Sequence, residues 1–368
     1  MRHVAPLRVL VVLTGGIVLG LAGHGLTGGF DDMTETVVSS TNHTAVSTTR
    51  ALLETTTSTT TLTTTSTTTS TTTSSTTLPP RGELVIHGTG DVNTDSAYIP
   101  ALAANGHAYA WEGLDGLFIG DDLTIINLEC TPSELGSPLP KQFVFRCDPD
   151  SLPAMRAAGV DVVNLANNHS RDHGAEALLD GVVQVEHEGM KAVGVGANAT
   201  EASAPAIVEV NGWTVAVVGF GGVVPTSDWI ATEDSPGMAD GDTVELMVEA
   251  VRAAKEVADL VIVTIHWGVE LDLEPEPEDR ERAAAMVEAG ADVIFGHHAH
   301  RLQPMEFIDG KPVAWNLGNF VWPNFSVPGS TTAVARVVVS PEGDIDACLI
   351  PALISAPGRP ELSDDPPC

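Results

Sequence analysis

Basic residues are scarce in this sequence. Only 17 Lys and Arg stand against 49 Asp and Glu in 368 residues, and the formal net charge is −32. Residues 81–368 carry 45 of these acidic and 14 of these basic residues, so their own net charge is −31. Nucleic acids and anionic lipid surfaces attract clustered Lys and Arg. The composition therefore argues against both as partners of this part of the chain.

Cysteine is scarce as well, and no CxxC pair occurs among the four cysteines. This argues against cysteine as a metal ligand. An even number of cysteines in an exported chain instead indicates disulfides, and four cysteines allow three pairings. Proximity in the sequence favours Cys130–Cys147 and Cys348–Cys368.

The N-terminal apolar run is short. The uncharged segment extends from Val9 to Phe30, but its strongly apolar part ends at Ala22, whereas a spanning helix needs about 20 apolar residues. This length is typical of a signal peptide, although no clean Ala-x-Ala cleavage site follows. Residues 1–30 are thus predicted to be a signal peptide or an N-terminal membrane anchor. Because arginines precede the run and aspartates follow it, the rest of the chain is expected outside the cytoplasm, secreted or held at the cell membrane.

Apolar side chains are nearly absent from the next segment. Residues 55–77 are Thr and Ser except for Leu62, and two prolines follow. Such a tract cannot bury enough surface to offset its chain entropy, so residues 31–80 are predicted to form a disordered stalk. An O-glycosylated stalk and a plain linker both remain open. The folded domain is expected over residues 81–356, followed by a C-terminal tail over 357–368.

No internal repeat occurs in residues 81–356, where short apolar runs alternate with amphipathic helical patterns. The expected strands are Glu83–His87, Leu123–Leu128, Val160–Leu165, Trp213–Phe220, Leu260–His266 and Val293–Phe295. The expected helices are Ser151–Ala158, Ala175–Glu188, Thr243–Ala258 and Glu276–Ala289. Later strands, expected to pair antiparallel, are Met305–Ile308, Val313–Leu317, Thr332–Val339 and Ile345–Ile350. This alternation predicts an α/β domain with helices covering the sheets.

Several of these strands run directly into polar clusters at their carboxyl ends, where ligands collect in α/β sheets. The side chains that could bind metal are Asp91, Glu129, Asn168, His266, His298 and His300. This set of oxygen and nitrogen donors suits two divalent ions of Mn, Fe or Zn, with one carboxylate as the bridge. On an extended segment, His298 and His300 would point to the same side, whereas His297 would be structural.

Other polar residues near these clusters have two interpretations each. His169 follows the ligand candidate Asn168 and could act as a general acid. Asp172 could orient His169 or cap the helix that begins near residue 174. Lys141 and Arg146 could bind an anionic substrate or form surface salt bridges.

The order and spacing of six motifs resemble the CapA family of poly-γ-glutamate capsule synthesis proteins. The motifs are GDVNTD (90–95), NLEC (127–130), GVDVVNLANNHSRDHG (159–174), VIVTIHWGVE (261–270), AGADVIFGHHAHRLQP (289–304) and WNLGNFVW (315–322). The resemblance implies a calcineurin-like metallophosphatase sandwich, with two β-sheets flanked by helices. It also implies that Asp91 and His300 bind a first metal. Asn168, His266 and His298 would then bind a second metal, and Glu129 would bridge the two.

Two positions depart from the metallophosphatase pattern. The Asp-x-His of that pattern is Asp91-Val92-Asn93 in this sequence. The Gly-Asn-His-Asp of that pattern is Asn167-Asn168-His169-Ser170, so the nearest carboxylate is that of Asp172. The family implies a role in making, anchoring or processing an extracellular anionic polymer such as poly-γ-glutamate, and a polymer-synthesis complex is a candidate partner. The alternatives are a metal-dependent phosphoesterase that acts on an exported substrate and a non-catalytic scaffold of a polymer-export complex. The sequence leaves open whether the protein is an enzyme.

Overall fold

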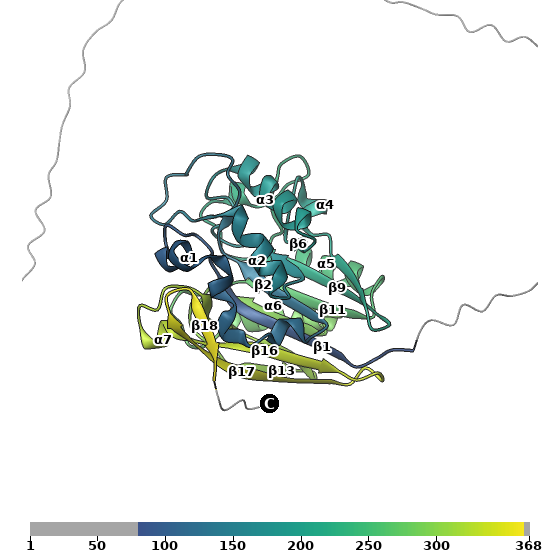
Figure 1. Cartoon of the computed structure of the whole chain (residues 1–368). Coiled ribbons are helices and arrows are strands. Elements are labelled where there is room, and N and C mark those ends of the chain that lie inside the picture. Colours follow the sequence, from purple (N-terminus) through teal and green to yellow (C-terminus); the bar gives the residue numbers. More distant parts are fainter. Residues whose placement is uncertain (1–79, 364–368) are drawn as a thin grey trace, which may run out of the picture. The chain divides into compact units, whose positions relative to one another are not determined.

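A computed structural model describes residues 80–363 of the chain (Figure 1). The predicted signal peptide or anchor, the Thr/Ser-rich tract and Cys368 lie outside the described residues. Within residues 80–363, no helix is both long and apolar enough to cross a membrane.

The larger sheet has eight strands and contains the N-terminal strand of the domain. Its order is β18-β17-β16-β1-β2-β5-β6, and β15 also pairs with β1. The neighbours β1 and β2, β2 and β5, and β5 and β6 pair in parallel. On the other side of β1, each of the strands β16, β17 and β18 pairs antiparallel with the strand before it in the sheet. The bounds are β1 Leu84–Val92, β2 Leu123–Leu128, β5 Val162–Asn164, β6 Lys191–Val193, β15 Asn319–Val321, β16 Thr331–Val339, β17 Ile345–Ala356 and β18 Arg359–Leu362.

The smaller sheet has six strands in the order β13-β14-β12-β11-β9-β8. Its central strands β9, β11, β12 and β14 are parallel. The bounds are β8 Ala206–Val210, β9 Trp213–Gly221, β11 Leu260–His266, β12 Val293–His297, β13 Met305–Ile308 and β14 Lys311–Ala314. Two short pairs lie outside both sheets, β3 Thr131–Pro132 with β4 Arg146–Cys147 and β7 Val195–Gly196 with β10 Gly237–Met238.

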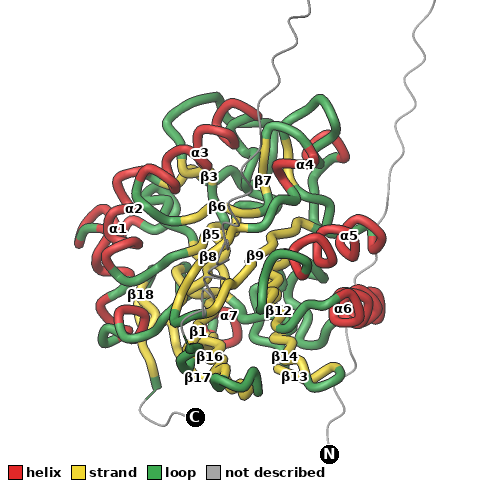
Figure 2. Tube along the Cα trace, turned by 90° about the vertical axis from the view of Figure 1, so that its right-hand side faces the viewer, coloured by secondary structure: helices red, strands yellow, loops and turns green. Residues whose placement is uncertain are grey.

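The two sheets pack face to face and helices cover their outer faces. Alternate residues of β2 face opposite ways: Leu123 and Ile125 belong to the core between the sheets, whereas Ile126 and Leu128 belong to the core under the helices. The helices over the larger sheet are α1 Pro100–Asn105, α2 Leu152–Ala157 and α3 Ala175–His187, and those over the smaller sheet are α5 Val244–Lys255 and α6 Pro277–Ala289 (Figure 2). Two helical turns, α4 Ala199–Ala202 and α7 Val327–Ser330, complete the set. The expected sandwich of two sheets flanked by helices is confirmed.

Strand β1 is longer than expected because its glycines do not end it. A side chain at Gly88 would collide with the ring of Phe295, and one at Gly90 would collide with the carbonyl oxygen of Gly318. Glycine is therefore needed where the second sheet and β15 approach this strand. The result is that β1 continues to Val92 and carries Asp91 within the strand.

The predicted boundary between the domain and a C-terminal tail over 357–368 is wrong, because the folded domain continues past residue 356. The chain turns at Gly358, which has φ +77°, and residues 359–362 form β18 against β17. A four-residue strand with Arg, Pro and Glu has too little apolar alternation to be recognised from sequence.

The expected Cys130–Cys147 disulfide is present, with 5.4 Å between the two Cα atoms. It joins the chain at the carboxyl end of β2 to β4, next to the β3–β4 pair. Cys348 is also disulfide-bonded, but Cys368 lies outside the described residues, so that pairing stays a prediction.

Candidate metal centre

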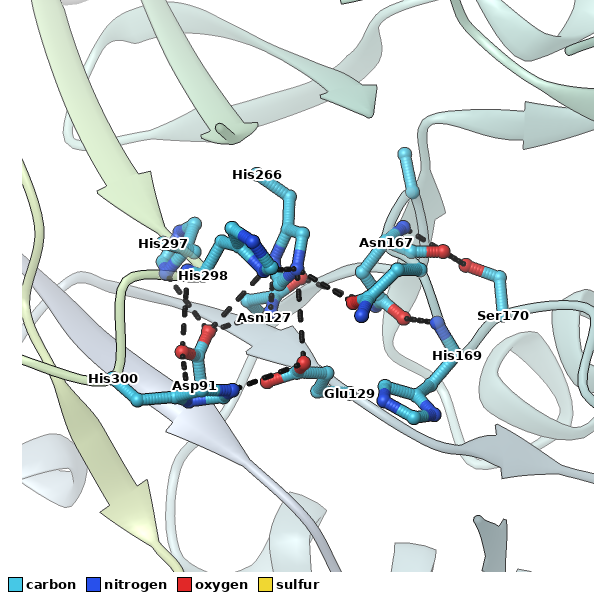
Figure 3. A network of polar contacts seen from close by, with 12 residues as sticks. Asp91, Asn127, Glu129, Asn167, His169, Ser170, His266, His297, His298 and His300 are labelled. Carbon is cyan, nitrogen blue, oxygen red and sulfur yellow. Dashed lines mark hydrogen bonds and ion pairs between the residues drawn. The ribbon is translucent and has the colours of Figure 1, made fainter. Parts of the chain in front are cut away.

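Five predicted ligands come together at the carboxyl ends of the parallel strands of both sheets, as Figure 3 shows for Asp91, Glu129, His266, His298 and His300. The sixth, Asn168, contacts His266 there. Asp91 lies near the end of β1, and Glu129 directly follows β2. From the other sheet, His266 ends β11, and the segment that holds His298 and His300 follows β12. Because the sheets face each other, their strand ends deliver carboxylates from one side and imidazoles from the other.

Glu129 lies at the centre of this cluster. Its side chain is completely buried, and within residues 80–363 neither carboxylate oxygen has a hydrogen-bond partner. Oε1 lies 3.7 Å from Nε2 of His266 and 3.7 Å from Nε2 of His300. Burial, together with the nearby charge of Asp91, raises the pKa of Glu129 well above its usual value. A buried carboxylate without a partner is costly, which indicates that a cation belongs beside it.

Asp91 is also fully buried but is well supported. Its Oδ1 accepts a hydrogen bond from Nδ2 of Asn127 at 2.8 Å, and its Oδ2 lies 3.3 Å from Nδ1 of His300. Oδ2 also accepts the backbone N–H of His298 at 3.2 Å. Burial opposes ionisation, but the hydrogen bond and charge of His300 outweigh it, so the pKa of Asp91 is lowered. The carboxylate is thus held ionised and in place.

The second group of donors gathers around His266. Its Nε2 lies 2.9 Å from Oδ1 of Asn168 and 3.1 Å from Nδ1 of His298. Burial and the neighbouring imidazoles lower the pKa of His266 well below its ordinary value and that of His298 to about 4. Both rings are therefore neutral near pH 7, the form in which imidazole binds metals.

His300 differs from these two histidines. Burial opposes its charged form, but the carboxylates of Glu129 and Asp91 outweigh this effect and raise the pKa of His300 to about 9. Its Nδ1 also lies 2.8 Å from Oδ1 of Asn319. The carboxylates of Asp91 and Glu129 thus favour a positive charge next to them. Either a proton on His300 or a metal ion can supply this charge.

The candidate donor atoms form two groups that share one carboxylate. Glu129, His266 and His298 offer donor atoms within 4.8 Å of one another, and so do Asp91, Glu129 and His300. Glu129 is common to both groups, which is the place expected of a bridging ligand. The mixture of carboxylate, imidazole and amide without sulfur suits Mn, Fe or Zn.

The backbone from His298 to His300 is not extended, so the prediction that an extended segment points both side chains to the same side is wrong. His298 has φ +94° and His300 φ +52°, both in the left-handed region that non-glycine residues rarely adopt. The turn brings both rings to the site by a different path. His297, expected to be structural, bonds Thr264 through Nε2 at 2.9 Å and places Nδ1 3.8 Å from Oδ1 of Asp91.

Asp172 contacts His169 directly. Its Oδ2 lies 2.7 Å from Nδ1 of His169 and accepts the backbone N–H of Phe145 at 2.7 Å. The N-cap of α3 is Gly174, not Asp172, so of the two interpretations the geometry supports orientation of His169. Burial lowers the pKa of His169, although Asp172 opposes that effect.

The two basic residues occupy different places. Lys141 donates to Oδ1 of Asp172 and to the backbone carbonyl of Asn168, both at 2.5 Å, so its ammonium is held beside the centre. Arg146 instead contacts Ser133 and His173, and lines a separate cavity of about 470 Å³. None of these side-chain contacts, all within residues 80–363, involves a candidate ligand. Substrate binding by Lys141 or Arg146 stays a prediction.

Three residues near the centre were not predicted as site residues. Asn127 and Asn319 bond the candidate ligands Asp91 and His300, and Glu270 places a carboxylate oxygen near His298 and His300. All three lie inside the motifs quoted for the family resemblance, which is the one signal that could have identified them.

Comparison with known proteins supports the resemblance. The model of the family described as "Bacterial capsule synthesis protein PGA_cap" matches residues 85–324. The PGA biosynthesis protein CapA of Bacillus subtilis (strain 168) is 34% identical over 183 residues, 50% of this chain and 48% of that protein. The capsule biosynthesis protein CapA of Bacillus anthracis is 36% identical over 177 residues, 47% of this chain and 43% of that protein. The chain spans about half the length of the curated relatives it matches.

Solved structures with a similar arrangement are more distant. The NAD nucleotidase NadN of Haemophilus influenzae is 14% identical, with a TM-score of 0.46 over 74% of this chain and 56% of that chain. The 5'-nucleotidase of Candida albicans SC5314 is 14% identical, with a TM-score of 0.43 over 75% of this chain and 53% of that chain. At these TM-scores the likeness carries no argument about the site.

Proposed function

Since the chain belongs to the bacterial capsule synthesis protein family PGA_cap, we propose that it acts in the synthesis, anchoring or processing of an extracellular anionic polymer such as poly-γ-glutamate. The names of the relatives support this polymer class, because two of them are CapA proteins of capsule or PGA biosynthesis. The Cys130–Cys147 disulfide supports a place outside the cytoplasm, where disulfides persist.

We further propose that the centre holds two divalent metal ions and is a hydrolase-type site. The observation that carries this proposal is Glu129, a completely buried carboxylate that lacks a hydrogen-bond partner within residues 80–363 and that belongs to both donor groups. Asp91 and His300 would bind one ion together with Glu129. Asn168, His266 and His298 would complete the ligands of the other. When bound, such ions polarise an ester or amide carbonyl or phosphoryl oxygen and make water a better nucleophile.

The surrounding residues have distinct tasks in this proposal. Asp172 accepts the Nδ1–H of His169, so the protonated ring can give the proton on Nε2 to the leaving group and become neutral. Phe145 packs against the same ring, with 4.2 Å between centroids, and limits its rotation. Lys141 balances the second oxygen of Asp172 and ties it to the backbone of Asn168. One candidate metal ligand and the proton donor are therefore positioned by the same lysine.

The test is an assay of the purified chain, loaded with Mn²⁺ or Zn²⁺, on poly-γ-glutamate and on a panel of phosphoesters. We expect the polymer to be shortened, and Glu129→Gln to abolish this reaction. Glu134→Gln, an exposed change in the following loop, is the matched control and should react as the wild type does. Turnover of phosphoesters alone would favour a phosphoesterase acting on an exported substrate. A chain that binds metal and turns over neither would favour a scaffold.

A further inference from the structure

The donor group around Asp91 is short of ligands. Asp91, Glu129 and His300 offer three donors, and the position that would hold a histidine in the Asp-x-His pattern is Asn93. The side-chain oxygen of Asn93 accepts the backbone N–H of Asp95 at 2.8 Å. Its Nδ2 is buried without a partner within residues 80–363, and an amide nitrogen is a donor that cannot bind a cation. Asn93 therefore does not supply the missing ligand.

Glu270 offers a carboxylate beside two histidines of the centre, one of which is His300, from a different segment. One of its oxygens and the ring nitrogens of His298 and His300 all lie within 4.8 Å of one another. Glu270 lies on the loop after β11 and its side chain is exposed, so it reaches the centre from the solvent side. Many carboxylates are exposed on the surface of this acidic protein. Among those of residues 80–363, Glu270 is the exposed carboxylate that lies near two imidazoles of the centre.

The loop that carries Glu270 is fastened to the histidine segment. The backbone N–H of Leu271 donates to the carbonyl of Ala299 at 2.8 Å, between the two histidines. Gln303 also holds the loop, because its Nε2 donates to the carbonyls of Asp272 and Glu274 at 3.1 and 3.2 Å. These bonds fix the distance between the Glu270 backbone and His298 and His300.

The same two segments contain unusual backbone conformations. Leu271, His298 and His300 are three of the six non-glycine residues with positive φ in residues 80–363. Such conformations cost about 1 kcal/mol or more each, and persist where the surrounding structure enforces them, commonly at functional sites. Here Leu271 directly follows Glu270, and His298 and His300 carry the two rings whose nitrogens lie near its carboxylate.

We propose that Glu270 is a further metal ligand of this centre, bound on its solvent side next to His300, and that it supplies the donor that Asn93 does not. This inference rests on the proposed dinuclear site. It assigns three carboxylates to the centre, of which Asp91 and Glu129 are buried and Glu270 is exposed.

Manganese binding without any substrate tests the assignment. The wild-type chain, Glu270→Gln and Asp272→Asn are stripped of metal, titrated with Mn²⁺ by calorimetry, and analysed for bound manganese after dialysis. Asp272 is an exposed residue of the same loop, and its substitution removes the same charge, so it controls for general electrostatic attraction. Thermal unfolding of the metal-free proteins should show the same Tm for all three, because both changed side chains are exposed.

We expect Glu270→Gln to weaken the binding of one Mn²⁺ by at least about tenfold, the scale on which even supporting residues of metal sites act. Asp272→Asn should bind as the wild type does. Glu270→Gln with the same affinities and stoichiometry as Asp272→Asn would overturn the assignment and leave the dinuclear site standing. A wild-type chain that binds no Mn²⁺, Zn²⁺ or Fe²⁺ would instead remove the proposed site itself.

Discussion

The buried ion pair between Lys141 and Asp172 allows a test that needs no substrate. Asp172 is completely buried, and its side chain meets Lys141, His169 and the backbone of Phe145 at 2.5 to 2.7 Å. Removing one partner of a buried pair leaves a charge without compensation and costs about 3 to 5 kcal/mol. Because the Lys141 side chain is 18% exposed, water compensates part of this cost. We therefore expect Asp172→Asn to lower the free energy of unfolding by about 3 kcal/mol.

A double-mutant cycle isolates the contribution of the pair. Lys141→Met alone should cost roughly 1.5 kcal/mol, and the double variant should cost less than the sum of the two single changes, with a coupling energy of about 1 to 2 kcal/mol. The assay is urea unfolding with the disulfides intact, followed by far-ultraviolet circular dichroism. The more exposed pair Arg156–Asp161 is the control, and its coupling should stay below about 1 kcal/mol.

A coupling below about 0.5 kcal/mol for Lys141 and Asp172, within the range found for independent sites, would refute this reasoning. It would mean that Lys141 does not hold Asp172, and that the orientation of His169 depends on Asp172 and Phe145 alone.

Three other predictions concern the disulfide, the histidines and the membrane topology. Replacing Cys130 and Cys147 together by serine should cost about 3 kcal/mol in urea unfolding, and equal stability of the two proteins would contradict a role in fixing the Glu129 segment. His300→Ala should lose bound metal together with activity. His169→Ala should keep its metal and lose about 10²–10⁴ in rate, most strongly on substrates whose leaving group needs a proton; a metal-free His169→Ala would make His169 a ligand. A reporter fused after Pro80 should be active only if it functions outside the cytoplasm, and activity of a cytoplasmic reporter there would contradict the charge argument.

The parts of the fold that could be predicted are those with a strong apolar pattern. Strands β2 and β11 have the bounds expected from sequence, because each is a continuous apolar run that is buried on both faces. The six candidate ligands could be placed at one edge because parallel strands deliver their carboxyl ends to the same side. Strand β18 could not be predicted, since its four residues show too little apolar alternation, although its partner β17 directly precedes it in the chain.

The site details that could not be predicted depend on loop conformation. Glu270 lies four residues after His266 in an acidic loop, and apart from its place in the motif VIVTIHWGVE nothing in the sequence separates it from the other exposed carboxylates. The left-handed conformations of His298 and His300 likewise arise from tertiary contacts, because neither residue prefers them. The role of Asp172 was ambiguous in the sequence for a related reason. A carboxylate just before a helix can either cap that helix or orient the His169 ring. Only the contacts of Asp172 in the folded structure distinguish these two roles.

The central claim is that Glu129 bridges two metal ions, and elemental analysis of the purified chain tests it most directly. The protein is produced with Mn, Fe and Zn available, dialysed, and compared with Glu129→Gln and with the exposed control Glu134→Gln. The account predicts about two divalent ions per chain in the wild type and in Glu134→Gln, and the loss of both in Glu129→Gln, since the bridge belongs to both donor groups. Metal content that is unchanged in Glu129→Gln, or a wild-type chain without metal, would contradict it.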